Sequence, residues 1–171
     1  MKKLNKMIFL SLLVSIGLAL SVLESAIPLP VTIPGARLGL SNVVILVTLV
    51  IFGFKESLIV GILKSIVLIL VTGSVSSLIY SLSGAILASI TMYVIYKYFS
   101  KVFSLIGVSV LGAVAHNIGQ VSAAVLMMSN LRIYSYLPIL LLMSLFTGYF
   151  VGLSSNFITK NLVKSLKSYF I

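Results

Sequence analysis

The sequence contains no cysteine, no aspartate and no tryptophan, and Glu24 and Glu56 are its only acidic residues. The absence of cysteine excludes a disulfide framework and a thiolate metal site. A Ser/His/Asp triad is excluded because there is no aspartate and neither glutamate lies near His116, the single histidine. No Walker A sequence is present, so the chain does not hydrolyse ATP. We therefore expect no catalytic residues, no metal and no cofactor.

Charged residues make up only 8% of the 171 residues, whereas 60% are hydrophobic and the mean hydropathy is +1.27. Soluble domains carry roughly 25% charged residues. A core of this size cannot hide so much apolar surface, so lipid must cover it. We predict an all-α integral membrane protein with one membrane domain over residues 1–171. The net charge of +10 is then explained by basic anchors at lipid headgroups rather than by binding of nucleic acid.

Proline, glycine and charged residues divide the chain into six apolar segments, which predicts a six-transmembrane-helix bundle. The expected spans are 7–27, 40–54, 57–73, 78–97, 103–129 and 136–158. The second span is short and is expected to be tilted, kinked or continued by the loop before it. Residues 1–22 resemble a signal peptide, but their apolar run is long, so we interpret them as a retained first helix.

The distribution of basic residues predicts the orientation of the bundle. If the N-terminus is cytoplasmic, nine lysines fall on the cytoplasmic side: Lys2, Lys3, Lys6, Lys55, Lys97, Lys101, Lys160, Lys164 and Lys167. Only Arg37 and Arg132 fall on the outer side. The positive-inside rule then places both termini in the cytoplasm of a multi-pass plasma-membrane protein.

Lys64 lies near the middle of the third span, in 57-SLIVGILKSIVLIL-70. A charge at that depth costs roughly 3 kcal/mol on insertion scales. Lys64 is therefore expected either to face protein or water, as a ligand-binding residue does, or to extend its ammonium group to the cytoplasmic interface.

The fifth span contains three polar residues, in 112-GAVAHNIGQ-120. His116 and Gln120 are four residues apart and share a helix face, and Asn117 lies beside His116. Flanking small residues would permit close helix contact. The three side chains are interpreted either as interhelical hydrogen-bonding groups or as the polar floor of a ligand cavity.

The segment 24-ESAIPLPVTIPGARLGLSN-42 connects the first two spans. Its three prolines within residues 28–34 predict an extended, stiff loop. Arg37 is expected on the outer face and Asn42 one turn into the second span. We interpret the loop as a ligand clamp, with a tight loop held by an Arg37–Glu24 ion pair as the alternative.

Arg132 is the second basic residue expected on the outer side, in 129-SNLRIY-134. It is interpreted either as a contact to lipid headgroups or, together with Arg37, as part of a site for an anionic ligand.

In the first span, Ser11, Ser15 and Ala19 recur every four residues, as do Gly17, Ser21 and Ser25. Such stripes permit close helix packing, either inside the bundle or against another membrane subunit.

Two motifs, 33-IPGARLGLSNVVILVTLVIFG-53 and 112-GAVAHNIGQ-120, resemble the small bacterial membrane proteins called the Gx transporter family, also described as heptaprenyl diphosphate synthase component I. The resemblance covers nearly the whole chain. This family is similar to the substrate-binding S components of energy-coupling factor (ECF) transporters.

The resemblance implies a six-helix membrane subunit that binds a micronutrient from outside and docks on a membrane scaffold driven by two ABC-type ATPases. The first loop would cap the site, Ser11, Ser15 and Ala19 would form the docking face, and His116, Asn117 and Gln120 would line or support the cavity. We expect an ECF-like uptake subunit as the main hypothesis.

The alternative hypothesis is a non-catalytic membrane component of a heptaprenyl diphosphate synthase that serves isoprenoid quinone synthesis beside a soluble prenyl synthase subunit. The chain cannot hold the diphosphate-bound Mg²⁺ of such enzymes alone, because that site needs aspartate-rich motifs. A closed polar pocket beneath the outer loop would favour transport, and a lateral apolar groove facing the inner leaflet would favour a prenyl chain.

Overall fold

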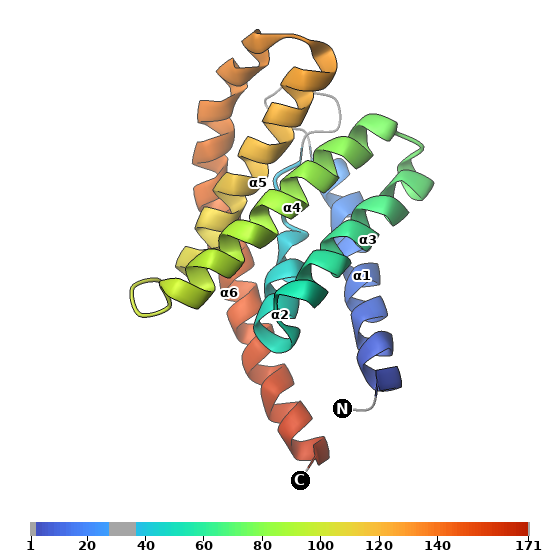
Figure 1. Ribbon diagram of the computed structural model, residues 1–171, viewed down its shortest axis with the longest axis vertical. Coiled ribbons are helices and arrows are strands. Elements are labelled where there is room, and N and C mark those ends of the chain that lie inside the picture. Colours follow the sequence, from blue (N-terminus) through green and yellow to red (C-terminus); the bar gives the residue numbers. More distant parts are fainter. Residues whose placement is uncertain (1–2, 28–36, 171) are drawn as a thin grey trace.

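The computed structural model describes residues 3–27 and 37–170, with side chains described over 4–27 and 37–164. These residues form helices and no strand, which confirms the all-helical prediction for this part of the chain. The elements, shown in Figure 1, are α1 (Lys3–Ser25), α2 (Asn42–Phe52), α3 (Phe54–Thr72), α4 (Val75–Tyr98), α5 (Leu105–Met128), the 3-10 helix η1 (Leu131–Tyr136) and α6 (Leu137–Phe170).

Within the described residues, four helical stretches are long and apolar enough to cross a membrane: Leu4–Ser25, Val75–Tyr98, Leu105–Met128 and Leu131–Lys164. Helix α3 has 19 residues and carries three charged residues, Lys55, Glu56 and Lys64. Helix α2 has only 11 residues, so it rises about 16 Å, roughly half of a ~30 Å hydrocarbon core.

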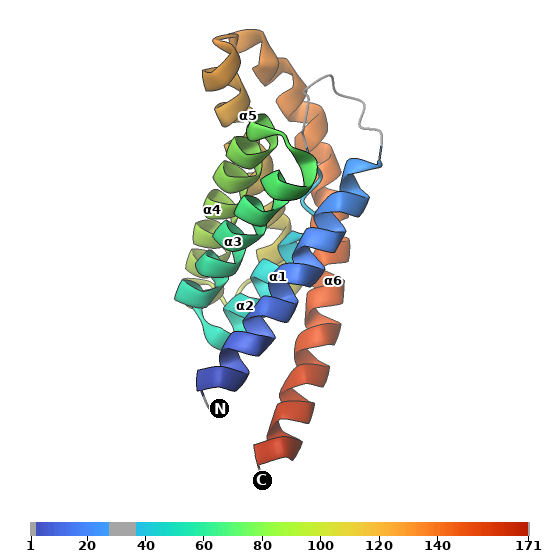
Figure 2. The same ribbon diagram turned by 90° about the vertical axis from the view of Figure 1, so that its right-hand side faces the viewer.

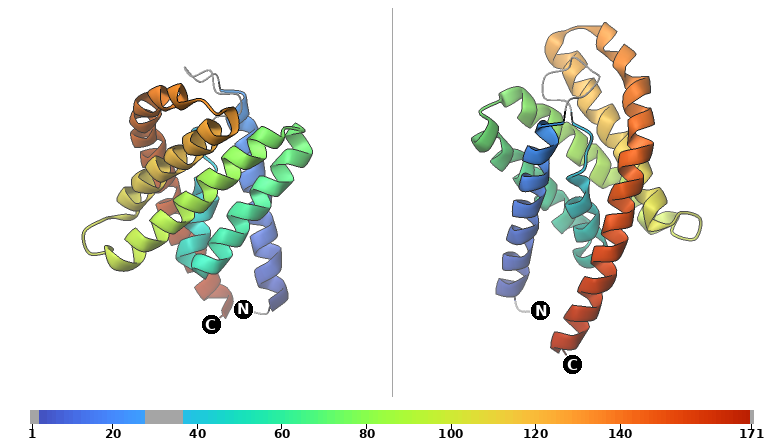
Figure 3. Two further views of the ribbon diagram at one scale, coloured as in Figure 1. Left: turned by 45° about the horizontal axis from the view of Figure 1, so that its top comes forward. Right: turned by 180° about the vertical axis from the view of Figure 1, so that it is seen from behind.

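Helix α2 occupies the centre of the bundle and packs against each of the other five α-helices. Every residue from Val44 to Leu49 is buried. The connector, defined here as residues 37–41, leads into α2 between α1 and α6 (Figure 3, right). A short helix continued by irregular backbone is tolerated at membrane depth when protein surrounds it. Helix α2, at Asn42–Phe52, is shorter than the predicted span of 40–54, and the connector continues it as the sequence predicted.

The two ends of the bundle carry different segments (Figures 1 and 2). The start of α1, the α2–α3 turn, the α4–α5 loop and the end of α6 lie toward one end, and the α3–α4 turn and η1 lie toward the other. Helix α6 has 34 residues, so it is about 51 Å long and exceeds the thickness of the core. It continues beyond the predicted boundary at residue 158 because a helix does not need lipid around it to extend.

Candidate functional site

A group of buried polar side chains lies inside the bundle, and we call it the polar centre. Each member is at most 5% exposed: Ser21, Glu24, Arg37, Ser41, Asn42, Lys64, His116, Asn117, Gln120 and Ser144. They come from α1, the connector, α2, α3, α5 and α6. The structure thus brings together six of the seven predicted ligand-binding residues, namely Arg37, Asn42, Lys64, His116, Asn117 and Gln120.

Gln120 attaches the connector to α5. Its Oε1 accepts a hydrogen bond from the backbone N–H of Arg37 at 3.0 Å, and its Nε2 donates to the Arg37 carbonyl at 2.6 Å. The same Nε2 donates to Oδ1 of Asn117. One side chain therefore satisfies both backbone polar groups of a buried, non-helical residue, which would otherwise be costly.

Asn117 attaches α5 to α6. Its Nδ2 donates to the Leu140 carbonyl at 3.0 Å and to the Ser144 hydroxyl at 2.7 Å. Asn117 and Gln120 thus make the interhelical and helix–connector hydrogen bonds that polar groups inside a membrane bundle require. Of the two interpretations left open by the sequence, hydrogen-bonding support describes the contacts of both residues.

Glu24, at the end of α1, holds the turn of the connector. Its Oε1 accepts hydrogen bonds from the backbone N–H groups of Gly39 and, at 3.3 Å, Leu40. Gly39 has a φ of +87°, in the left-handed region that favours glycine. The connector therefore wraps its amides around the carboxylate, which replaces part of the hydration that this charge loses on burial.

Arg37 is buried at 5% exposure rather than on the outer face where the sequence placed it. Its Nη1 donates to the Ser21 carbonyl at 3.2 Å. No hydrogen bond joins the Arg37 and Glu24 side chains, and their hydrogen-bond partners among the described residues are backbone groups. The two groups interact only electrostatically. The prediction that Arg37 lies on the outer face is wrong, because the hydrogen bonds from Gln120 to the Arg37 backbone hold the connector inside the bundle.

Lys64 faces the protein and is 1% exposed. Its Nζ donates to the Ser41 hydroxyl at 2.7 Å, and a Cβ built at Gly17 would lie 3.2 Å from its Cδ. The close approach of α1 at Gly17 thus covers the lysine stem. Its ammonium group interacts electrostatically with Glu24 and Arg37. Lys64 therefore does not extend to the cytoplasmic interface.

His116 is held between two glycines. A Cβ at Gly84 would lie 2.6 Å from its Cε1 and 2.7 Å from its Nδ1, and a Cβ at Gly39 would lie 3.3 Å from its Cδ2. Neither ring nitrogen makes a hydrogen bond of ordinary geometry with a described residue, and the polar group nearest to the ring is the backbone of Gly84. The same part of the chain contains no group of three or more His, Cys, Asp or Glu side chains that could hold a metal ion.

Other polar atoms of the centre also lack partners among the described residues. They are both side-chain polar atoms of Asn42, Oε2 of Glu24, Nε of Arg37 and Oγ of Ser21. Each unmade hydrogen bond to a buried group costs about 1–3 kcal/mol. The polar centre thus has unused capacity to bind, concentrated around His116, Asn42 and the charged groups.

Arg132 is not part of the polar centre. It is exposed on η1, where its backbone N–H donates to Oδ1 of Asn130 at 3.0 Å. The structure therefore separates Arg132 from the buried Arg37, although the sequence placed both on one outer face. The proline loop of residues 28–36, interpreted as a ligand clamp, lies outside the described residues.

The two small-residue stripes of α1 face in different directions. Ser11, Ser15 and Ala19 are exposed, and the hydroxyls of Ser11 and Ser15 bond to carbonyls of their own helix, each at 3.0 Å. Gly17 and Ser21 are buried and face the bundle, whereas Ser25, the third residue of that stripe, is exposed. Internal packing therefore describes Gly17 and Ser21 but neither Ser25 nor the first stripe.

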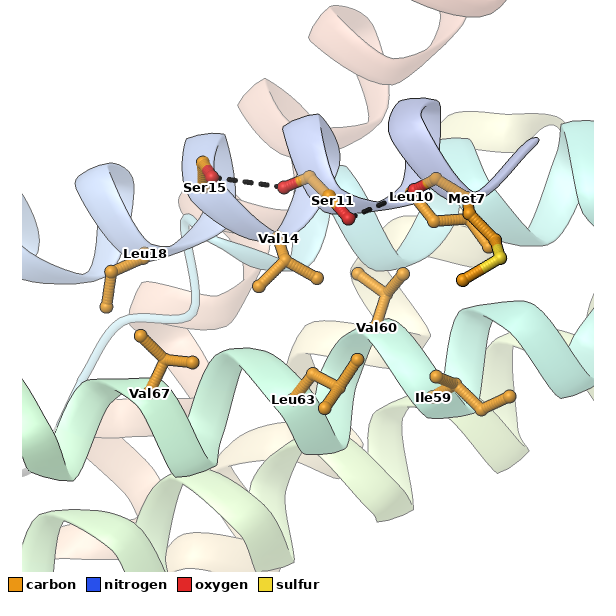
Figure 4. A pocket seen from close by; sticks show the side chains of 10 residues that line it. All are labelled: Met7, Leu10, Ser11, Val14, Ser15, Leu18, Ile59, Val60, Leu63 and Val67. Carbon is orange, nitrogen blue, oxygen red and sulfur yellow. Dashed lines mark hydrogen bonds between the residues drawn. The ribbon is translucent and has the colours of Figure 1, made fainter. Parts of the chain in front are cut away.

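Ser11 and Ser15 line an open groove between α1 and α3 with a volume of about 430 Å³. Figure 4 shows Val14 and Leu18 of α1 facing Leu63 and Val67 of α3 across it.

A second groove, here called the lateral groove, lies between α1, α2 and α6 and has a volume of about 320 Å³. Its lining is apolar throughout: Phe9, Leu12, Leu13, Ile16, Val43, Val44, Val47, Ile158 and Leu162. The lining residues come from the first two thirds of α1, the first six residues of α2 and the second half of α6. On α1 and α6 the groove therefore extends from the middle of the bundle toward the end where α1 starts and α6 ends, and on α2 it begins next to the connector.

Four members of the polar centre were not among the predicted binding residues: Ser21, Glu24, Ser41 and Ser144. Glu24 carried a usable signal, because it is one of only two acidic residues and ends an apolar span. Ser41 and Ser144 carried none, since serine is frequent throughout the chain and small enough to face any side of a helix.

A family model described as heptaprenyl diphosphate synthase component I matches residues 13–158. No curated protein and no solved structure matches the chain. The matched region includes the connector, the polar centre and α2 through most of α6. The chain therefore belongs to the heptaprenyl diphosphate synthase component I family.

Proposed function

We propose that this protein is the non-catalytic membrane component of a bacterial heptaprenyl diphosphate synthase. It would act in the plasma membrane beside a soluble, aspartate-rich catalytic subunit and serve isoprenoid quinone synthesis. Family membership supports this function. The composition supports a non-catalytic role, because two glutamates and no aspartate cannot bind diphosphate through Mg²⁺.

The proposed topology has six spans with both termini in the cytoplasm. The four long apolar helices supply four of the crossings, and α3 and α2 with its connector supply the other two. Burial of the connector and of the Lys64 side chain supports this assignment, since both are shielded from lipid. The start of α1 and the end of α6 lie at the same end of the bundle (Figure 1). An even number of crossings requires this arrangement.

The lateral groove is the observation that carries the proposal. It is wholly apolar and opens on the side of the bundle, as a site for a flexible hydrocarbon chain requires. In the proposed topology it extends from the middle of the membrane toward the cytoplasm, where the catalytic subunit would work. The basic residues expected at that surface suit an anionic diphosphate headgroup. The protein would thus hold the isoprenoid chain in the membrane while its partner extends it.

A pair of matched substitutions tests the groove. Leu12→Trp places an indole in the lateral groove, and Leu63→Trp places one in the α1–α3 groove; both leucines are exposed, at 57% and 45%. A photoreactive polyprenyl diphosphate should label wild-type protein in membranes on α1 or α6. Leu12→Trp should reduce this labelling and Leu63→Trp should not. Equal labelling of all three proteins would reject the groove as the prenyl site.

Partner identification tests the function itself. A C-terminal tag, extraction of native membranes in mild detergent and mass spectrometry of co-purifying proteins should recover a soluble prenyl synthase subunit. Reconstitution of the two should increase the yield of membrane-associated long-chain product over that of the soluble subunit alone. Recovery of a membrane scaffold with two ABC-type ATPases would instead overturn the proposal.

The second candidate is an ECF-like uptake subunit, and two observations favour it. Ser11, Ser15 and Ala19 form an exposed small-residue face that would dock on a scaffold helix. The polar centre would hold a small substrate through residues such as Arg37, Asn42, Lys64 and His116, supported by Asn117 and Gln120, whereas the exposed Arg132 lies outside this site. Replacing Ser15 with Leu should abolish scaffold co-purification in this case and leave recovery of a prenyl synthase subunit unchanged.

A further inference from the structure

We propose that the polar centre binds a small anion, a carboxylate or an inorganic oxyanion, between Arg37 and Lys64. This site is separate from the lateral groove. The inference rests on charges and hydrogen-bonding groups of the described residues, and it holds for either candidate function.

The first argument is the balance of charge. Arg37 and Lys64 are 5% and 1% exposed, and Glu24, at 3%, is the only acidic residue buried with them. The other glutamate, Glu56 on α3, forms an ion pair with Lys6. Lys6 is near the start of α1, whereas Glu24 is near its end. Two buried cations thus share one carboxylate, and an uncompensated buried charge is strongly unfavourable. One anion would neutralise the group.

The second argument is the surplus of hydrogen-bond donors. Nε of Arg37 and Nδ2 of Asn42 have no partner among the described residues. Lys64 has three N–H donors, and its Nζ makes a hydrogen bond to Ser41. Carboxylates and oxyanions accept several charge-assisted hydrogen bonds at once.

The third argument is preorganisation. The backbone of Arg37 is fixed on both sides by Gln120, and the next turn of the connector is fixed by Glu24 through the N–H groups of Gly39 and Leu40. The guanidinium is further oriented by the Ser21 carbonyl. Binding therefore requires little new ordering of the protein, which favours affinity for a ligand of few atoms.

The test compares Arg37→Gln with Arg132→Gln, which removes the same charge from an exposed position on η1. The full chain, purified in detergent and exhaustively dialysed, is titrated with sodium acetate or sodium phosphate while its melting temperature is recorded. Wild type and Arg132→Gln should show the same saturable rise. Arg37→Gln should need about tenfold to a hundredfold more anion, since it loses a charge-assisted hydrogen bond. Non-specific effects of salt would be equal in the two variants.

Glu24→Gln supplies a test with the opposite sign. It retains both cations and removes the competing carboxylate, so the apparent affinity for the anion should increase. A response to acetate alone would identify a carboxylate ligand, and a response to phosphate alone an inorganic oxyanion. No saturable response in either wild type or Glu24→Gln, or equal responses in wild type and Arg37→Gln, would show that water fills the site and would overturn the inference.

Discussion

Replacing Gly84 with alanine should destabilise the bundle through a contact with His116. The new Cβ would lie 2.6–3.0 Å from three atoms of the imidazole ring, Cε1, Nδ1 and Nε2. Real Cβ atoms do not approach so closely, and the ring is 2% exposed and lies against the connector at Gly39 on its other side. The ring must therefore move into the polar centre or force α4 and α5 apart.

Gly61 provides the matched control for this substitution. It is also a buried helical glycine, but its new Cβ would lie 3.4 Å from Ile45 Cδ1, an ordinary contact. Alanine in place of glycine gains about 1 kcal/mol of helix propensity at either position. Overpacking at Gly84 costs about 1–3 kcal/mol. Gly61→Ala should therefore be more stable than wild type, and Gly84→Ala less stable than Gly61→Ala by about 1–3 kcal/mol.

Unfolding of the purified variants in detergent measures the difference. The cause is isolated by combining Gly84→Ala with His116→Ala, which removes the ring. In that background the alanine at position 84 should recover the stabilisation seen at position 61, as a direct pairwise coupling requires. The reasoning fails if Gly84→Ala is as stable as Gly61→Ala, or if its cost persists without the imidazole.

Two further predictions concern other bonds of the bundle. Asn117→Leu should destabilise by about 1–2 kcal/mol in unfolding experiments, because the α5–α6 bonds are lost; Ser144→Ala should cost less, since Asn117 keeps its bond to the Leu140 carbonyl. At the start of α1, the hydrogen bond from Lys6 lowers the pKa of Glu56. The bond therefore contributes to the free energy of unfolding at pH values above the ordinary glutamate pKa. This contribution is lost as the pH falls through the lowered pKa of Glu56. It is worth about 1 kcal/mol or less at the surface, and a pH series with and without Glu56→Gln would measure it.

The helical fold was predictable because composition and breaks in hydropathy depend only on local sequence. The connector was not, because nothing local indicates that residues 37–41 enter the bundle. Arg37 looked like an outer-surface residue since it follows three prolines and precedes an apolar span. Its burial depends on Gln120, which is 83 residues away.

The candidate site was predictable where a polar residue interrupts an apolar helix. Lys64, His116, Asn117 and Gln120 stood out for this reason and are all buried together. Arg132 was grouped with Arg37 only because both were expected on the same side of the membrane. The side of the membrane does not determine whether a residue is buried in the bundle or exposed on its surface. The burial of serines such as Ser144 could not be predicted from the sequence, because it depends on which helix they face in the folded bundle.

Helix α2 links the two features on which the proposals rest. Asn42 belongs to the polar centre, whereas the next residue, Val43, lines the lateral groove. Substitutions in α2 would therefore disturb both features, while Leu12 reaches only the groove and Arg37 only the polar centre. If the anion fixes the first turn of α2, Arg37→Gln should weaken polyprenyl labelling of the groove as well as anion binding. Unchanged labelling in that variant would mean that the two sites are occupied independently, since coupling requires a shared element that responds to both ligands.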